Sequence, residues 1–310
     1  MTAFYMKKWY FDFATDKGET FYAYFITYRI FGKSQGLVSA HLTLPDDNLM
    51  QDSIATEYSS PNVEGKLAMG PHFLMQQNGR AKIHMELSHF TIDLQYFSLD
   101  KEWIPAKDAL LLKKRGRFLK WHVPQPRARV EGTIKNTFQV LKINGFGYQD
   151  IVETNIPPWR LPLAELIWGR AHCGGRTVVF NQITTKKRNV IQNILLSAGA
   201  DTDRPSQPED SASESEDNQR YALQTNNGDE GTRIVKSGWT LLLKRRSIIE
   251  DNPVTTSDRI RSSFLRNALA RIAGNPQEKK MFSEARLSDG EKIWDGLAIH
   301  ERVLWQWKTR

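Results

Sequence analysis

Two residues of one short segment have the side chains that acid catalysis in an apolar site would need. The segment reads Asn-Gly-Phe-Gly-Tyr-Gln-Asp at residues 144–150 and includes Tyr148 and Asp150. Adding water to an alkene, or cyclising it, requires a strong proton donor and shielding of the cation that forms. A carboxylic acid in an apolar cavity keeps its proton near neutral pH, because desolvation raises its pKa. We therefore predict that Asp150 donates the proton and that Tyr148 shares or orients it.

Aromatic and charged residues around this segment are candidates for ligand binding. Trp159 and Trp168 offer π faces to a developing carbocation or to an extended polyene. Glu153 is a second carboxylate close to Asp150 in sequence. Proton transfer of this kind needs neither a metal nor an organic cofactor, and we predict none. The predicted ligand contacts are Trp121, Glu153, Trp159, Trp168 and Arg170.

Each of these residues also has a purely structural interpretation. Asp150 can accept backbone N–H bonds in a tight turn, and Tyr148 can be a core aromatic residue with a satisfied hydroxyl. Trp168 can pack in a core, Arg170 can bind backbone carbonyls at the end of a barrel, and Glu153 can be a solvated carboxylate. The sequence leaves both interpretations open.

The elements that would position these residues have the sequence patterns of strands. Residues 9–31 read as two strands around the turn signal Asp-Lys-Gly, and residues 81–97 read as another hairpin. Residues 127–143 and 177–183 continue with β-branched and aromatic residues in strand patterns. Short strands with turns at this spacing are typical of an antiparallel barrel or sandwich. We therefore predict an all-β, mainly antiparallel fold.

The second half of the chain contains a change of composition. Residues 198–232 are rich in Asp, Glu, Ser, Asn, Pro and Gly and bury too little apolar surface to order themselves, so we predict a disordered acidic insertion. Apolar residues at helical spacing predict a helix over residues 257–273. Strand character resumes at 234–243 and at the C-terminal end. We predict two domains, residues 1–190 and residues 191–310, with the insertion inside the second.

Composition limits the partners and the compartment. The net charge is +8, and basic residues gather at 113–120 and at 244–246. Such runs can attract an anionic membrane surface or nucleic acid, or can be solvated strand edges that discourage pairing. No zinc-finger spacing, basic zipper or RNA-recognition motif accompanies the charge, so nucleic acid is disfavoured.

No stretch of about twenty apolar residues is present, and Asp12 interrupts the only N-terminal apolar run, so neither a spanning helix nor a secretory signal is expected. The single cysteine, Cys173, excludes an internal disulfide. The histidines at positions 72, 84 and 89 lack the spacing and companion ligands of a metal site. We predict a cytoplasmic protein that at most visits membrane surfaces.

Several of these motifs follow one another in a recognisable order. They are Trp-Tyr-Phe-Asp at 9–12, Trp121, Val-Glu-Gly-Thr at 130–133, Gly-Phe-Gly-Tyr-Gln-Asp at 145–150, and Trp-Gly-Arg at 168–170. That order resembles the carotenoid 1,2-hydratase (hydroxyneurosporene synthase) and AttH-like family of lipocalin-like proteins, most clearly over residues 121–182. Tyr148 and Asp150 match the family's Gly-Tyr-X-Asp step. Ile-Val-Glu-Thr at 151–154 replaces the His/Asn/Trp/Gly run that follows it in the hydratases.

The resemblance implies two lipocalin-like β-barrels and an apolar ligand, an isoprenoid or a polyene. Members of the family hydrate a terminal isoprenoid double bond, and related lipocalin-like proteins are pericyclic cyclases. One hypothesis is therefore a cofactor-independent hydro-lyase or cyclase. The second is a carrier that binds an apolar ligand without chemistry, and a weaker third is a basic module for nucleic acid.

Overall fold

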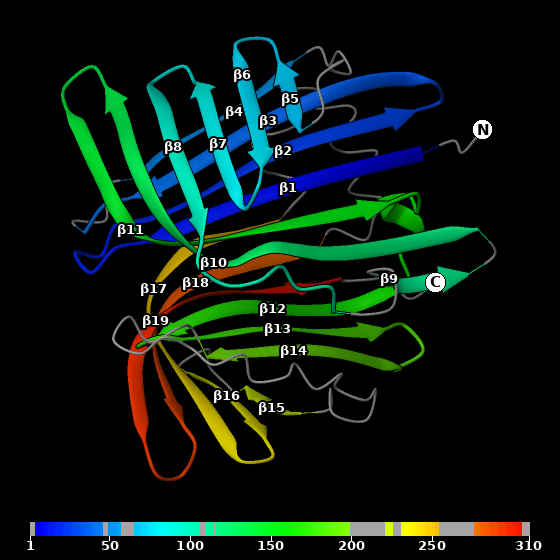
Figure 1. Cartoon of the computed structure of the whole chain (residues 1–310). Coiled ribbons are helices and arrows are strands. Elements are labelled where there is room, and N and C mark those ends of the chain that lie inside the picture. Colours follow the sequence, from blue (N-terminus) through cyan, green and yellow to red (C-terminus); the bar gives the residue numbers. More distant parts are fainter. Residues whose placement is uncertain are drawn as a thin grey trace. The chain divides into compact units, whose positions relative to one another are not determined.

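The chain forms two compact units that consist almost entirely of antiparallel strands (Figure 1). The computed structural model describes residues 4–45, 49–56, 65–105, 110–114, 116–198, 221–225, 231–253 and 276–305. The described residues up to Leu161 belong to the first unit, and those from Pro162 onward belong to the second. The predicted all-β, mainly antiparallel fold is therefore confirmed.

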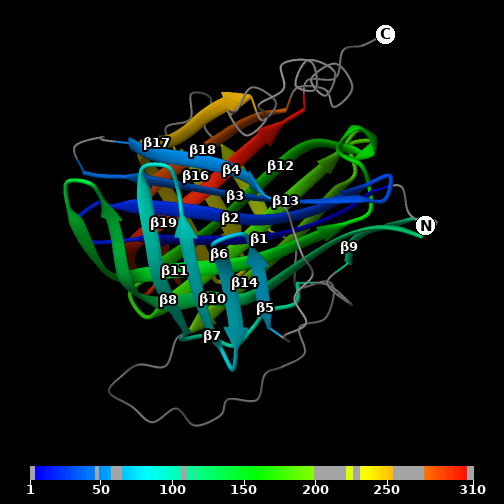
Figure 2. The same ribbon diagram turned by 90° about the horizontal axis from the view of Figure 1, so that it is seen from above.

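The first unit is a single sheet in which most neighbours in sequence are neighbours in space. Its strand order is β4-β3-β2-β1-β11-β10-β8-β7-β6-β5, with β9 paired to β10, and Figure 2 shows it from above. The strands are β1 (Phe4–Ala14), β2 (Thr20–Ile30), β3 (Lys33–Thr43), β4 (Leu49–Thr56), β5 (Lys66–Met69), β6 (His72–Gln77), β7 (Arg80–Glu86), β8 (Phe90–Ser98), β9 (Leu110–Lys114), β10 (Arg117–Asn136) and β11 (Val140–Thr154).

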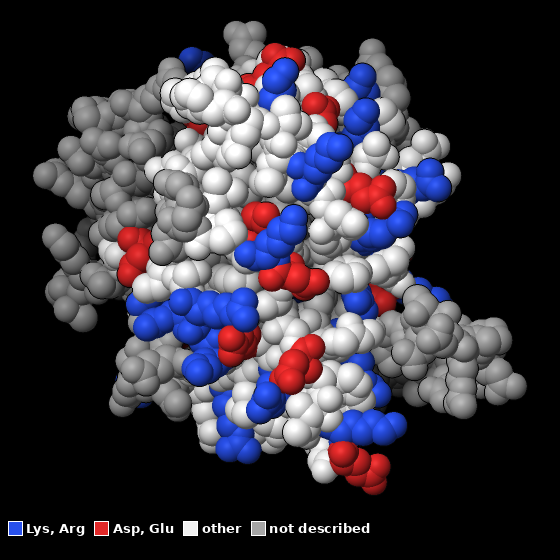
Figure 3. All heavy atoms as spheres, turned by 90° about the vertical axis from the view of Figure 1, so that its left-hand side faces the viewer, with Lys and Arg blue, Asp and Glu red and all other residues white. Residues whose placement is uncertain are grey.

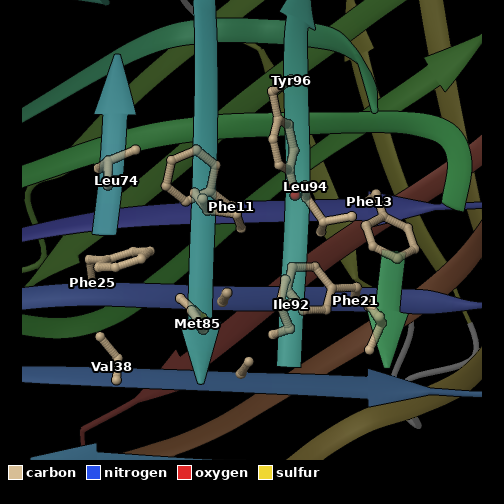
Figure 4. Close-up of a cluster of buried hydrophobic side chains, with 14 of the residues drawn as sticks. Phe11, Phe13, Phe21, Phe25, Val38, Leu74, Met85, Ile92, Leu94 and Tyr96 are labelled. Atoms are coloured by element: carbon tan, nitrogen blue, oxygen red, sulfur yellow. The ribbon is translucent and has the colours of Figure 1, made fainter. Parts of the chain in front are cut away.

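The core of this unit forms because successive side chains of a strand point to opposite faces of the sheet. Phe11 and Phe13 of β1 and Phe21 and Phe25 of β2 point to one face, where all four are fully buried. Strands from the other end of the sheet add side chains such as Leu74 to the same cluster, as Figure 4 shows. A sheet whose two ends share one apolar cluster must curl around it, so the unit is a barrel or half-barrel.

The turn between β1 and β2 is the one predicted from Asp-Lys-Gly. Gly18 has a φ of 97°, a conformation that favours glycine, and its N–H donates to the Thr15 carbonyl at 3.0 Å. The Thr15 hydroxyl donates to the Glu19 carboxylate across the same turn. This turn fixes the register of β1 with β2.

Gly147 makes the close approach of β11 to its neighbours possible. A Cβ added there would lie 2.2 Å from the Asp12 carbonyl oxygen and 2.6 Å from a methyl group of Val130. Backbone cannot move away as a flexible side chain can, so we expect Gly147→Ala to cost at least the roughly 1–3 kcal/mol typical of overpacking. Phe146→Ala, a change at the adjacent position with a half-exposed side chain, is the control. Urea unfolding of the two variants checks the prediction, and equal stabilities would contradict it.

The described part of the second unit is an eight-stranded sheet with the order β14-β13-β12-β19-β18-β17-β16-β15. Its apolar cluster includes Ile167, Phe180, Leu241 and Ala298 from four of these strands. The strands are β12 (Leu163–Cys173), β13 (Arg176–Thr185), β14 (Val190–Ala198), β15 (Ala222–Thr225), β16 (Gly231–Lys236), β17 (Trp239–Pro253), β18 (Gln277–Ser288) and β19 (Ile293–Leu304), preceded by the short 3-10 helix η2 (Pro158–Arg160).

The boundary between the units lies between Leu161 and Pro162, whereas the sequence prediction placed it at residue 190. The reason is a non-local pairing. β12 pairs with β19, near the C-terminal end of the chain, and this pairing assigns β12, β13 and β14 to the second unit. Strand patterns show where strands lie but not which distant strand each one pairs with.

The predicted acidic insertion falls mostly outside the described residues, but one part of it is a strand. β15 pairs with β16, and the preceding Tyr221 is buried, with its hydroxyl donating to the Asn181 carbonyl at 2.6 Å. Tyr221 and Leu223 pack on the second core, so the prediction of disorder over all of 198–232 is wrong for this segment. The predicted helix at 257–273 lies outside the described residues.

Charge on the surface is mixed in sign. On the face that Figure 3 shows, Lys and Arg side chains lie among Asp and Glu side chains. Where the structure describes the chain, no helix is long and apolar enough to cross a membrane. The predicted membrane-surface contact and cytoplasmic location stay predictions.

Candidate active site

Asp150 and Tyr148 lie in the middle of a continuous strand. Both belong to β11, and because they are two residues apart their side chains share one face of the sheet. β1 pairs with this part of β11, which places Tyr10 opposite Asp150 and Asp12 opposite Tyr148. The tight-turn interpretation of Asp150 is therefore wrong, since the residue is in a ladder between two neighbouring strands.

The two oxygens of the Asp150 carboxyl group have different surroundings. Oδ2 accepts a hydrogen bond from Nε1 of Trp121 at 3.1 Å and another from the Tyr148 hydroxyl at 3.0 Å. Oδ1 is buried and has no hydrogen-bond partner among the described residues. Two donors on Oδ2 leave Oδ1 as the oxygen that carries the proton when the group is neutral.

Burial sets the acidity of this group. Asp150 is 4% exposed, and desolvation of its charged form raises its pKa from 3.8 to about 6. The positive charge of Lys8 and the hydrogen bonds from Trp121 and Tyr148 oppose this rise, and the nearby Asp12 adds to it. A substantial fraction of Asp150 is therefore protonated in mildly acidic solution and a smaller one at neutral pH.

The raised pKa predicts how stability depends on pH. Because Asp150 binds its proton more tightly in the folded chain than in the unfolded chain, its contribution is fully present below pH 3.8 and is lost as pH rises through about 6. A difference of about two pKa units is worth up to about 3 kcal/mol. We expect Asp150→Asn to remove this dependence and to be more stable than the wild type at pH 8. Urea unfolding at a series of pH values checks this, and parallel pH profiles for the two proteins would contradict it.

Tyr148 and Trp121, which both donate to Asp150, pack against a layer of further aromatic rings. The ring centroid of Tyr10 lies 6.1 Å from that of Tyr148 and 5.4 Å from that of Tyr24. Trp121, which donates to Asp150, meets Trp103 edge to face at 5.3 Å. Aromatic faces attract cations, and this attraction is stronger where water is excluded. The layer can therefore stabilise positive charge that develops next to Asp150.

Removal of the tyrosine hydroxyl should raise the pKa of Asp150 further. Its hydrogen bond favours the charged carboxylate and so lowers the pKa of Asp150. We expect Tyr148→Phe, which keeps the ring, to raise that pKa above its wild-type value. The pH midpoint of the Asp150 carboxyl signal in ¹³C NMR checks this. An unchanged midpoint would show that the hydroxyl does not interact with the carboxylate in solution.

The other predicted ligand contacts belong to both units of the chain, and only Trp121 is seen to contact Asp150 in the described part of the chain. Trp121 contacts Asp150 directly. Glu153 is three residues from Asp150 on the same strand, so its side chain belongs to the opposite face, and the structure does not bring these two carboxylates together. Trp159 lies in η2, and its side chain is outside the described part. Trp168 and Arg170 belong to β12 of the second unit, where both are buried and Arg170 Nη1 lies 3.5 Å from Nδ1 of His172.

Sequence reasoning missed Tyr10 and Asp12, which neighbour Asp150, and Trp103, which packs against Trp121. Tyr10 and Asp12 were quoted only within the N-terminal apolar segment. The alternation of buried polar and aromatic side chains in β1 was a usable signal, because Tyr10 and Asp12 interleave with Phe11 and Phe13. The pairing of β1 with β11 was not visible in the sequence.

The described residues contain no candidate metal site. Among them no cluster of His, Cys, Asp and Glu side chains could hold a metal ion. His84 is instead bonded to Asp93, with 2.7 Å between Nδ1 and Oδ1. The expectation that no metal is needed remains a prediction.

The chain is similar to known proteins in structure but not in sequence. No protein-family model matches the chain, and no curated protein matches its sequence. The structure aligns with CghA crystallised with Sch210972, with a TM-score of 0.66 and 14% identity over 97% of this chain and 89% of that chain. It aligns with a putative AttH from Nitrosomonas europaea, with a TM-score of 0.62 and 12% identity over 97% of this chain and 93% of that chain.

A third similar structure has an enzyme name. Kievitone hydratase from Nectria haematococca aligns with a TM-score of 0.62 and 12% identity over 97% of this chain and 90% of that chain. Identities this low establish the fold alone. The chain therefore shares the lipocalin-like fold of CghA, an AttH protein and kievitone hydratase, as the resemblance implied.

Proposed function

We propose that the chain is a cofactor-independent enzyme that protonates a hydrophobic natural product, with Asp150 as the proton donor. The observation that carries the proposal is the asymmetry of the Asp150 carboxyl group. Oδ2 is occupied by Trp121 and Tyr148, whereas Oδ1 is buried with no partner among the described residues. A neutral acid held in this way can present its proton to a substrate that accepts no ordinary hydrogen bond, such as an alkene.

The proposed reaction begins with transfer of the Oδ1 proton to one carbon of a double bond. The π electrons form the new C–H bond, the other carbon becomes a cation, and Asp150 becomes a carboxylate. The rings of Tyr10 and Tyr148, whose centroids are 6.1 Å apart, would stabilise that cation. In a hydratase, water adds to the cation and its surplus proton returns to Asp150. In a cyclase, a second double bond attacks the cation, and loss of a proton to Asp150 completes an isomerisation.

The structural neighbours support a hydrophobic small molecule as the substrate, and the resemblance supports an isoprenoid or polyene. One similar structure is a hydratase of kievitone by its name, and another was crystallised with the small molecule Sch210972. We propose an isoprenoid or polyene as substrate, with acyclic carotenoids as the first compounds to test. The proposed contact with membrane surfaces would give access to such ligands and predicts binding to anionic vesicles at low salt.

Incubation with a panel of acyclic carotenoids and polyenes in H₂¹⁸O, followed by mass spectrometry, tests the proposal. A hydratase gives a product that contains ¹⁸O, and a cyclase gives an isomer of unchanged mass. Binding of a panel compound with no product would favour the carrier hypothesis. One observation favours that hypothesis: Ile-Val-Glu-Thr at 151–154 replaces the polar run that follows the acid in the hydratases.

A further inference from the structure

The first unit contains a second candidate site, on the opposite face of the sheet from Asp150. A cleft of about 570 Å³ lies between the β6–β7 turn, the end of β8, and the paired strands β10 and β11. Gln125 of β10 and Gln149 of β11 both line it and are partners in the strand register. Since Gln149 adjoins Asp150 in the strand, its side chain points to the other face.

Gln149 is a buried amide without a hydrogen-bond partner in the described part of the chain. The residue is 0% exposed, and neither its Nε2 nor its Oε1 has a hydrogen-bond partner among the described residues. Burial of an amide is unfavourable unless it is hydrogen-bonded. Because both amide atoms are free, exchanging the positions of the nitrogen and oxygen would not change this conclusion. A side chain of this kind in the wall of a cleft indicates a site that a ligand completes.

Gln125 adds one more acceptor that has no partner among the described residues. One of its hydrogen bonds also identifies which of its side-chain atoms that acceptor is. The residue is 2% exposed, and its Nε2 donates to the Gly79 carbonyl at 2.8 Å. A carbonyl only accepts, so this bond identifies the nitrogen and leaves Oε1, which has no partner among the described residues, as the free atom. The unit therefore presents two acceptors and one donor, from residues that face each other across two strands.

The charges around the cleft balance. Arg80 and Lys101 contribute two positive charges, and Asp100 and Glu102 contribute two negative charges. Glu102 is also within 3.0 Å of Nε2 of His122. A lining without excess charge favours a neutral ligand over an anion or a cation.

We propose that this cleft binds a neutral planar group that has an amino group beside a hydrogen-bond acceptor, as at the edge of a primary carboxamide. The two amino hydrogens would be donated to Oε1 of Gln149 and Oε1 of Gln125, and the ligand's acceptor would receive Nε2–H of Gln149. The site is separate from the Asp150 chemistry and does not depend on the proposed function.

Benzamide is the probe, and N,N-dimethylbenzamide, which has no N–H, is its matched control. Binding to the full chain is followed by NMR through the Gln149 side-chain NH₂ signal, which is assigned from its loss in Gln149→Met. We expect benzamide to shift this signal and to bind at least tenfold more tightly than the dimethyl compound. Equal binding of the two compounds, no binding of benzamide, or an equal shift by benzyl alcohol would overturn the proposal.

The affinity of side-chain variants for benzamide tests whether the ligand binds at Gln149. Gln149→Met should weaken benzamide binding at least tenfold, whereas Gln95→Met, at an exposed position of β8 outside this cleft, should leave it unchanged. Gln149→Glu exchanges the donor for an acceptor and should reverse the preference from benzamide to the cation benzamidine. Equal weakening in the Gln149 and Gln95 variants would overturn the assignment. Asp150→Asn should still bind benzamide, so a failure of this site and a failure of the proposed enzyme are distinguishable.

Discussion

Asp150→Asn is expected to lower turnover of any substrate found in the panel by about 10²- to 10⁴-fold, the contribution typical of a positioned general acid. Asparagine keeps the size of the side chain, and its oxygen can still accept from Trp121 and Tyr148. It has no acidic proton to transfer. We therefore expect binding of the substrate to change little while the rate of the chemical step collapses, as single-turnover kinetics with both proteins would show.

Glu153→Gln is the matched control for this experiment. It makes the same chemical change three residues along the same strand, on the other face of the sheet. Turnover in the Glu153 variant should stay within a small factor of the wild type. Loss of activity in both variants, or full activity in Asp150→Asn, would contradict the assignment of Asp150 as proton donor.

Lys280→Met is expected to destabilise the second unit by about 3–5 kcal/mol, the cost of removing one partner from a buried ion pair. Lys280 is fully buried in β18, and its Nζ lies 3.2 Å from Glu278 Oε1 and 2.7 Å from Glu301 Oε2. Methionine fills the same space but leaves two carboxylates without their shared cation. Their repulsion and desolvation then oppose folding.

Lys279→Met is the control for that change, because it alters the adjacent residue of the same strand. The Lys279 side chain is 24% exposed, and its Nζ lies 3.8 Å from the mostly exposed carboxylate of Asp251, a geometry worth about 0–1 kcal/mol. Thermal and urea unfolding of the two variants should therefore differ clearly. Comparable losses of stability would show that the buried triad is not coupled as the structure indicates.

Much of the first unit could be predicted because most of its strands pair with strands that are adjacent in sequence. The hairpin at β1 and β2 was set by a glycine turn between aromatic runs. The hairpin at β7 and β8 was indicated by alternating apolar and polar residues on either side of Ser88-His89. Adjacent strands in sequence pair in space over most of this sheet, so strand patterns nearly specify the topology. The continuous span of β10 was missed, because Pro124 and Pro126 interrupt its pattern. The strand accommodates this region with two shifts of register.

The second unit was harder to predict for a physical reason. The pairing of β12 with β19 joins residues more than a hundred positions apart, and nothing local encodes it. The predicted strand at 234–243 is in fact the end of β16 and the start of β17, separated by a turn in which Gly238 has a φ of 82°. Tyr221 lies in a stretch of polar composition, and its burial depends on a hydrogen bond to a strand far away in sequence.

In the candidate site, too, residues of a local motif could be predicted, whereas residues brought in by non-local pairing could not. Tyr148 and Asp150 were found because their types and spacing suggest acid chemistry, and Trp121 because it belongs to the same motif order. Tyr10 and Asp12 could be assigned to the site only after β1 was seen to pair with β11. Gln149 was overlooked although it separates the two residues singled out, because an amide between them suggests no chemistry until its missing partners are known.

The central claim is that Asp150 is a buried acid that keeps its proton unusually well, and direct titration of its carboxyl group tests this claim. The protein labelled with ¹³C at aspartate carboxyls, with Asp150→Asn used to assign the signal, gives that pKa from the pH dependence of one chemical shift. The structure predicts a midpoint of about 6. A midpoint close to 3.8, the ordinary value for this side chain, would mean that the group is a carboxylate at working pH and would contradict its role as proton donor.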